Sequence, residues 1–260
     1  MGVAAVVLLA VLGAVVGSFL NVCIDRLPLK LSLLRPGSHC SSCLHPLAPL
    51  DLVPIFSYLW LRGRCRYCRV RISWRLPVVE AVTGALFAFI GVRYGVGPKG
   101  LVLLAYASLL VAVFFIDLEH RLVLDRLVYP GAAVALILAP WAPPGAEAGV
   151  LAGYLASLEG GGVALGVFLV VYLASRGGMG AGDVKLAALV GLMLGLRLTL
   201  VALPISFMVG GLAGVLMLAL RLKGRRDPVP FGPFLSGATV VAIFWGGPIL
   251  EWYQGLVGIV

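Results

Sequence analysis

The chain has 260 residues, of which 61% are hydrophobic and only 12% charged, with a mean hydropathy of +1.08. Charged residues normally supply about a quarter of a soluble domain, so this composition excludes a single water-soluble domain and predicts a multi-spanning membrane protein. The net charge of +9 is that of many nucleic-acid-binding proteins, but the placement of the charges argues for membrane topology instead, and we expect no nucleic-acid partner.

The first apolar run extends from Met1 to about Val22. No basic residue precedes it and it contains no small-residue cleavage site, so we expect a retained transmembrane helix over residues 1–25 rather than a removable signal peptide. Residues 26–75 form the only sizeable polar segment and carry nine of the twenty Lys and Arg residues. We expect this segment to be a separate domain between the first and second transmembrane helices.

Two CxxC pairs lie in the polar segment and are separated by 21 residues. They comprise Cys40, Cys43, Cys65 and Cys68. This spacing is close to that of a four-thiolate zinc site, which fills all four coordination positions and is structural rather than catalytic. Thiols stay reduced in the cytoplasm, so we favour zinc over disulfides, with a redox pair as the less favoured alternative. The fifth cysteine, Cys23, is expected to be a buried apolar residue.

Seven further apolar runs follow, and residues 76–260 are expected to form a seven-helix transmembrane domain. The runs lie at about 77–96, 100–116, 127–141, 158–174, 184–199, 200–220 and 234–250. A span needs about 20 residues to cross the hydrocarbon, and several of these runs are shorter. The predicted fold is therefore an all-α polytopic membrane protein of about eight transmembrane helices, with a small zinc-ribbon-like cytoplasmic domain between helices 1 and 2.

The positions of the cations predict the orientation. With the N-terminus outside, seventeen of the twenty Lys and Arg residues lie on the inner side and only Arg93, Lys99 and Arg197 lie outside. This matches the positive-inside rule, under which cytoplasmic loops carry the excess of basic residues. The inner cations can also attract anionic membrane lipid. We therefore expect the polar segment to face the cytoplasm.

Two aspartates fall at the inner ends of separate apolar runs. Asp117 ends the third span, and Asp183 follows the glycine-rich turn Gly180-Ala181-Gly182 and begins the sixth. Ionisable groups at membrane depth are functional-site candidates, and two aspartates that share a proton can activate water, one as base and the other as acid. Taken alone, Asp183 can equally be read as a helix N-cap.

Other acidic residues have structural explanations or none. Asp125 is expected to cap the fourth span, and Glu119 and His120 are read as solvated loop residues. Glu80, at the inner end of the second span, can pair with Arg75 or Lys185, and its role stays open. Gly180 and Gly182 are expected to support the site, because a glycine lets a substrate backbone approach closely.

At this point the motifs resemble those of the type IV prepilin peptidases. The resemblance covers about residues 10–240, and its motifs occur in the order of that family. They are Gly17-Ser18-Phe19-Leu20-Asn21-Val22, Arg26-Leu27-Pro28, the two CxxC pairs, Pro77-x-x-Glu80, Phe115-Ile116-Asp117, Gly180-x-Gly182-Asp183 and Pro230-Phe231-Gly232-Pro233.

The resemblance implies an intramembrane aspartic protease of the GxGD type in the bacterial inner membrane, with residues 76–260 as the catalytic domain and Asp117 and Asp183 as the catalytic pair. Such enzymes remove the basic leader of type IV prepilins and of type II secretion pseudopilins at the cytoplasmic face, after a glycine. Many also methylate the new N-terminus with S-adenosylmethionine, and the cysteine-bearing insert accompanies that bifunctional type. No motif in the sequence independently identifies an S-adenosylmethionine pocket.

One position departs from the family pattern, because Leu124 stands where a proline usually precedes the aspartate at position 125. Two functions of other classes stay as rivals. A transporter or channel could use Asp117 and Asp183 as a proton relay, although a relay needs acids spread across the bilayer. A zinc-module scaffold without chemistry would make both aspartates dispensable.

Overall fold

The computed structural model describes residues 2–142, 149–175, 178–221 and 229–257. Four of the cations that are predicted to lie on the inner side fall outside the described residues, namely Arg176, Lys223, Arg225 and Arg226. The chain forms two compact units, Met1–Ala112 and Val113–Val260.

The described residues contain long helices and no strand, only two isolated bridges. Among the described residues, six helices are long and apolar enough to cross a membrane, which confirms the all-α polytopic prediction. They are α1 (Val3–Arg26), α3 (Arg75–Tyr94), α4 (Pro98–His120), α7 (Val150–Ala174), α8 (Ala181–Ala219) and α9 (Gly232–Val257).

The predicted count of about eight spans differs from this in two places. The predicted fourth span is helix α5 (Asp125–Leu138), which has only 14 residues and contains Pro130. The predicted sixth and seventh spans are joined in α8, whose 39 residues are interrupted by the non-helical backbone of Gly195. At 1.5 Å per residue, α8 is about 58 Å long, roughly twice the thickness of the hydrocarbon core.

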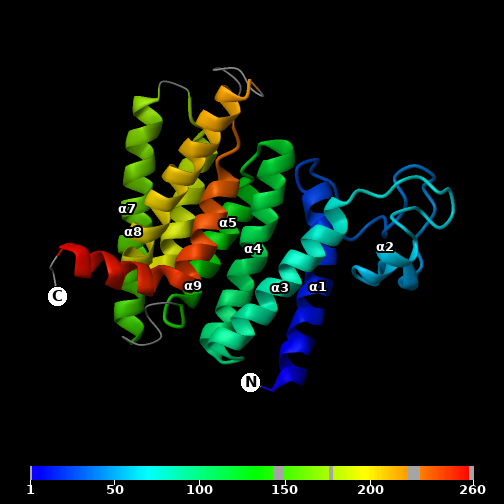
Figure 1. Ribbon diagram of the computed structural model, residues 1–260, viewed down its shortest axis with the longest axis horizontal. Helices are drawn as coiled ribbons and strands as arrows, with labels where there is room; N and C mark the ends of the chain where they lie inside the picture. The colour runs from blue at the N-terminus through cyan, green and yellow to red at the C-terminus, as the bar shows by residue number, and fades with distance from the viewer. Residues whose placement is uncertain (1, 143–148, 176–177, 222–228, 258–260) are drawn as a thin grey trace. The chain divides into compact units, whose positions relative to one another are not determined.

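In the first unit, α1 packs along α3 (Figure 1). The two backbones come close because glycines lie at the contact. A Cβ on Gly13 would lie 2.7 Å from the Thr83 carbonyl oxygen, and one on Gly84 would lie 2.9 Å from that of Ala10. Small residues at helix contacts are typical of membrane proteins, where close packing replaces the hydrophobic effect between helices.

The cysteine-bearing segment joins these two helices, since α1 ends at Arg26 and α3 begins at Arg75. It contains the short helices η1 (Pro49–Leu52) and α2 (Phe56–Trp60) and lies beside the C-terminal end of α1 and the N-terminal end of α3 (Figure 1). The predicted division at residues 25 and 75 into a metal-binding and a catalytic domain stays a prediction.

In the second unit, α8 packs against α5, α7 and α9. At the α7–α8 contact, a Cβ on Gly160 would lie 2.6 Å from the carbonyl carbon of Gly195, so glycine is needed there for the close approach. Farther along, rings from three helices gather around Phe231, which directly precedes α9. Its ring centroid lies 5.6 Å from those of Phe168 and Phe207 and 6.2 Å from that of Phe234. This aromatic cluster fixes the start of α9.

Candidate active site and metal centre

Asp117 lies in the last turn of α4 and is only 4% exposed. Its Oδ2 accepts a hydrogen bond of 2.8 Å from the backbone N–H of Gly232, which begins α9. A buried carboxylate needs such a partner, because an unpaired charge away from water is costly. Residues 115 positions apart therefore meet at this carboxyl group.

Asp183 lies in the first turn of α8 and is partly exposed. The N-cap of α8 is Gly180, in extended conformation, and no side chain caps the helix. The N-cap reading of Asp183 is therefore wrong, and its carboxyl group is left available for another role. Asp117 and Asp183, the two predicted catalytic residues, both lie in the second unit.

The glycines before Asp183 have different surroundings. A Cβ on Gly182 would lie 2.8 Å from the Cβ of Val123, in the loop between α4 and α5. A Cβ on Gly180 would have no atom nearer than the Asp183 Oδ2, at 3.5 Å. Gly182 thus lets the glycine-rich turn pack against the loop that follows Asp117, which links the two aspartate-bearing segments.

Asp125 does not cap α5, contrary to expectation. The N-cap is Leu124, and the Asp125 carboxylate accepts bonds of 2.8 and 3.0 Å from the Lys185 Nζ. Leu124 has φ −83° and ψ 122°, close to the backbone that proline adopts. The loop therefore has nearly the same local geometry with leucine as with proline.

Glu119 and His120 end α4 instead of lying in a loop. Glu119 is exposed, whereas the Nε2 atom of His120 is buried and has no hydrogen-bond partner in the described residues. The solvated-loop prediction is therefore wrong for the histidine. A histidine three residues after Asp117 could have been flagged, because i and i+3 lie on one helix face.

Glu80 does not pair with Arg75, the predicted partner in its own unit. Its Oε2 accepts a 2.7 Å bond from the backbone N–H of Ile55, and Ser18 also hydrogen-bonds to it. Arg75 instead bonds to Asp25 at 2.7 Å. Glu80 thus ties the cysteine-bearing segment to α3 within the first unit.

The four predicted ligand cysteines meet at one point. Their sulfur atoms all lie within 4.8 Å of one another, and all four are free thiols. Such a set can hold a metal ion, as predicted. The fifth cysteine, Cys23, is buried in α1, away from the set.

Both knuckles have the same backbone geometry. The N–H of Cys40 donates to His45 O, and that of Leu44 donates back to Cys40 O. Cys65 repeats this pattern with Val70 and Arg69. In each knuckle the residue four after the first cysteine has positive φ, 58° at Leu44 and 60° at Arg69, an uncommon conformation for a non-glycine residue. The repeated backbone geometry indicates that the two knuckles form equivalent halves of one four-cysteine site.

The backbone amides of the first knuckle favour the form of cysteine that binds metals. Hydrogen bonds from the amides of Cys43 and Ser42 lower the pKa of the Cys40 thiol to about 6. The thiolate, not the thiol, is the metal ligand. Cys40 is therefore prepared for metal binding near neutral pH.

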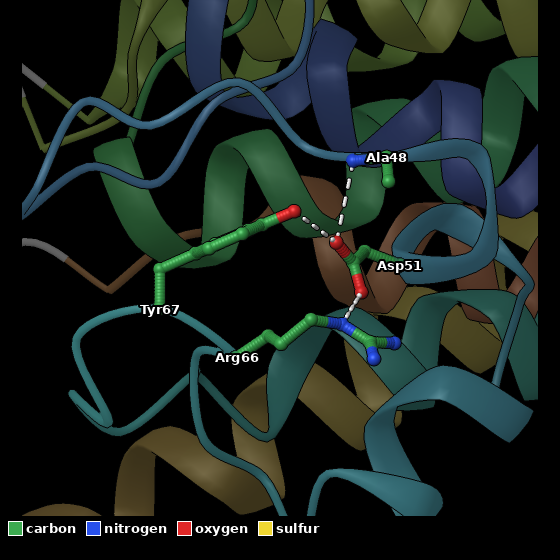
Figure 2. Close-up of polar contacts among 4 residues, drawn as sticks. All are labelled: Ala48, Asp51, Arg66 and Tyr67. Atoms are coloured by element: carbon green, nitrogen blue, oxygen red, sulfur yellow. Dashed lines mark hydrogen bonds and ion pairs between the residues drawn. The ribbon is translucent and has the colours of Figure 1, made fainter.

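Asp51 connects η1 to the second knuckle (Figure 2). Its carboxylate accepts bonds of 2.6 Å from Arg66 Nε, 3.3 Å from the Tyr67 hydroxyl and 3.2 Å from the Ala48 N–H. Burial would raise the pKa of Asp51, but the Arg66 hydrogen bond and charge outweigh it, and the pKa lies below its ordinary value. Because Arg66 and Tyr67 lie between Cys65 and Cys68, Asp51 holds that knuckle in place.

We expect Asp51→Asn to loosen the cysteine-bearing segment by about 1 kcal/mol, since a charged hydrogen bond is lost but Arg66 is partly solvated. Limited proteolysis in detergent should cut the segment about fivefold faster at pH 7. A lowered pKa contributes stability that is complete above the ordinary value of about 3.9 and is lost as the pH falls through the folded value. The difference between variant and wild type should therefore vanish in acid, and a constant difference would contradict this.

Two family models match successive parts of the chain. Residues 11–94 match the model of the bacterial peptidase A24 N-terminal domain, and residues 104–215 match that of the type IV leader peptidase family. The chain belongs to the type IV leader peptidase family. The family match of the second part contains both Asp117 and Asp183, and that of the first contains all four clustered cysteines.

Relatives that are similar over nearly their full length are named prepilin leader peptidase/N-methyltransferase. The protein of Pseudomonas putida is 35% identical over 97% of this chain and 95% of its own, and that of Aeromonas salmonicida 34% over 93% and 91%. The Bacillus subtilis protein is 31% identical over 95% and 96%. No solved structure matches the chain. The membership fits a multi-pass membrane protease and gives no support to the transporter or channel alternative.

Proposed function

We propose that this protein is a membrane aspartic endopeptidase that removes the leader peptide from type IV prepilins, with Asp117 and Asp183 as its catalytic pair. The observation that carries this proposal is that the two aspartates lie at the ends of different helices whose flanking segments pack together, since Gly182 lies against Val123. The names of the relatives support the substrate class.

The chemistry needs one charged and one protonated carboxyl group. The charged aspartate takes a proton from water as the water oxygen bonds to the scissile carbonyl carbon, and the other gives its proton to the carbonyl oxygen. In the second step the first aspartate returns its proton to the leaving nitrogen, the C–N bond breaks, and the second aspartate recovers a proton from the diol. The pair ends with one shared proton, as it began.

The orientation is part of the proposal. With the N-terminus outside, the positive-inside rule puts the cysteine-bearing segment and the aspartate-bearing helix ends on the cytoplasmic side. A prepilin has a basic leader and an apolar helix, so the helix would lie among the spans while the leader contacts the inner surface. That surface is cationic, and anionic lipid or the exposed Glu119 would help to bind the leader.

We further propose that the four-cysteine set holds a structural zinc ion. A tetrahedron with Zn–S bonds of about 2.3 Å has edges of about 3.8 Å, and the Cys40 and Cys68 sulfurs lie 3.8 Å apart. Between residues 27 and 74, all of which are described, Cys65 is the only buried residue. The segment therefore lacks a hydrophobic core, and a metal would supply the stability that burial does not.

The proposal extends to N-methylation of the new N-terminus with S-adenosylmethionine as methyl donor, because the relatives are named N-methyltransferases. Type II secretion pseudopilins are proposed as additional substrates, since the resemblance covers enzymes that process both.

The test is incubation of the purified protein with a prepilin, with and without S-adenosylmethionine, followed by mass spectrometry of the products. We expect leader release after a glycine in both reactions, and a mature chain one methyl group heavier only with the donor. An intact prepilin in both reactions would contradict peptidase activity, and cleavage without added mass would contradict methylation alone.

A further inference from the structure

We propose that the backbone N–H of Gly232 makes Asp117 the charged member of the catalytic pair, so that Asp117 acts as the base and Asp183 as the acid. This inference rests on the proposed function, and it divides the two roles, which that function leaves undivided between the aspartates. Gly232 is a positioning residue, because it acts on the reaction through Asp117.

The first observation is that the backbone N–H of Gly232 is available to donate outside its own helix. The first N–H groups of a helix have no partner within the helix. In α9, Pro233 has no N–H, and the Phe234 N–H donates to Phe231 O. Of these first three residues, Gly232 is the one whose N–H points out of the helix, and it donates to Asp117 Oδ2 at 2.8 Å.

The second observation is the charge that this geometry favours. A helix N-terminus carries partial positive charge. A hydrogen bond that an N–H donates to a charged carboxylate is also roughly twice as strong as one donated to a neutral group. Asp117 receives both effects at the start of α9, and the donated N–H is the one that distinguishes it from Asp183. Asp183 lies in the first turn of α8 and so is also near a helix N-terminus, but among the described residues no N–H lies within 3.5 Å of its carboxyl group in hydrogen-bond geometry. The single negative charge of the pair therefore falls on Asp117.

The third observation is that only glycine fits. A Cβ at position 232 would lie 2.7 Å from Asp117 Oδ2 and 3.1 Å from both its Cβ and its Cγ. The start of α9 cannot easily retreat, because Phe231 is held among Phe168, Phe207 and Phe234. An added methyl group must therefore displace the Asp117 carboxyl group.

The kinetic test compares two alanine substitutions in α9. Gly232→Ala should lower kcat about 100-fold while KM changes no more than about twofold, the pattern of a lost transition-state interaction. The matched control is Gly237→Ala, five residues along the same helix, where an added Cβ meets nothing within 4 Å. It should stay within about twofold of wild type. Equal kcat values for the two variants would overturn the inference.

A second variant removes the donor without adding any atom. Glycolic acid incorporated at position 232 replaces the N–H by an ester oxygen, so the protein keeps its shape even if Gly232→Ala does not fold. We expect kcat to fall at least about tenfold, with KM unchanged. If this ester is as active as wild type while Asp117→Asn and Asp183→Asn are inactive, the protease proposal stands and the role of Gly232 is wrong.

The assignment of the charge is tested by two labels. An epoxide is opened by a carboxylate, which bonds to its carbon while the ring oxygen takes a proton from water. A diazoacetyl ester is protonated by a carboxylic acid, loses N₂ and alkylates the resulting carboxylate. Peptide mapping should find the epoxide adduct on Asp117 and the diazo-derived ester on Asp183. The reverse distribution would overturn the assignment.

Discussion

Asp117→Asn and Asp183→Asn should each lower prepilin cleavage by about 10⁴-fold or more, which is the scale found when one member of a catalytic unit is removed. Asparagine has the shape of aspartate but can neither accept a proton from water nor give one to a carbonyl oxygen. At position 117 its Oδ1 atom can still accept the Gly232 N–H, so we expect the fold to survive. Cleavage would be measured by mass spectrometry, and folding by thermal unfolding in detergent.

The matched control is Asp125→Asn, in the loop that follows Asp117. Asp125 forms an ion pair with Lys185 in which both side chains are substantially exposed, 54% and 36%, and such pairs contribute about 1 kcal/mol or less. We expect activity within about threefold of wild type. If either catalytic-site variant retains cleavage comparable to that of Asp125→Asn, the two aspartates are not the catalytic pair.

The second large effect is expected at the metal centre. Cys65→Ser should reduce bound zinc from about one ion per chain to almost none, because structural zinc is bound and the segment folded in one step. Serine cannot replace the thiolate, and Cys65, 3% exposed, is the only buried residue of the segment. Bound zinc would be measured by mass spectrometry of the metal, and the folding of the cysteine-bearing segment by limited proteolysis.

Cys23→Ser provides the control for this prediction. Cys23 is buried within α1, and a serine there can hydrogen-bond to the helix backbone. Its zinc content and its protease resistance should equal those of wild type. Retention of zinc by Cys65→Ser, or equal loss in both variants, would contradict a four-thiolate site that holds the segment together.

Local patterns predicted the elements of this protein well. The apolar runs gave the helices, and the CxxC spacing gave the cluster of Cys40, Cys43, Cys65 and Cys68. These features depend on neighbours in sequence. The break in α8 was harder to locate, because Gly195 interrupts a continuous apolar stretch and is one glycine among 34.

Contacts between distant residues could not be predicted in this way. The pairing of Asp125 with Lys185 spans 60 positions and that of Glu80 with Ile55 spans 25. The hydrogen bond from Gly232 to Asp117 was partly predictable, because a Gly-Pro pair at the start of a helix leaves the glycine N–H without a partner in the helix. The Gly-Pro pattern indicates a free N–H donor but does not identify the carboxylate that accepts its hydrogen bond.

The most direct test of the central claim, that Asp117 and Asp183 act together on one tetrahedral centre, uses a prepilin peptide in which a hydroxyethylene group replaces the scissile amide. Transition-state analogues bind at least about 100-fold more tightly than the corresponding substrate. We predict that wild type shows this preference over the amide peptide, measured as competing dissociation constants, and that Asp117→Asn and Asp183→Asn both lose it. A preference that survives in either variant would contradict the account.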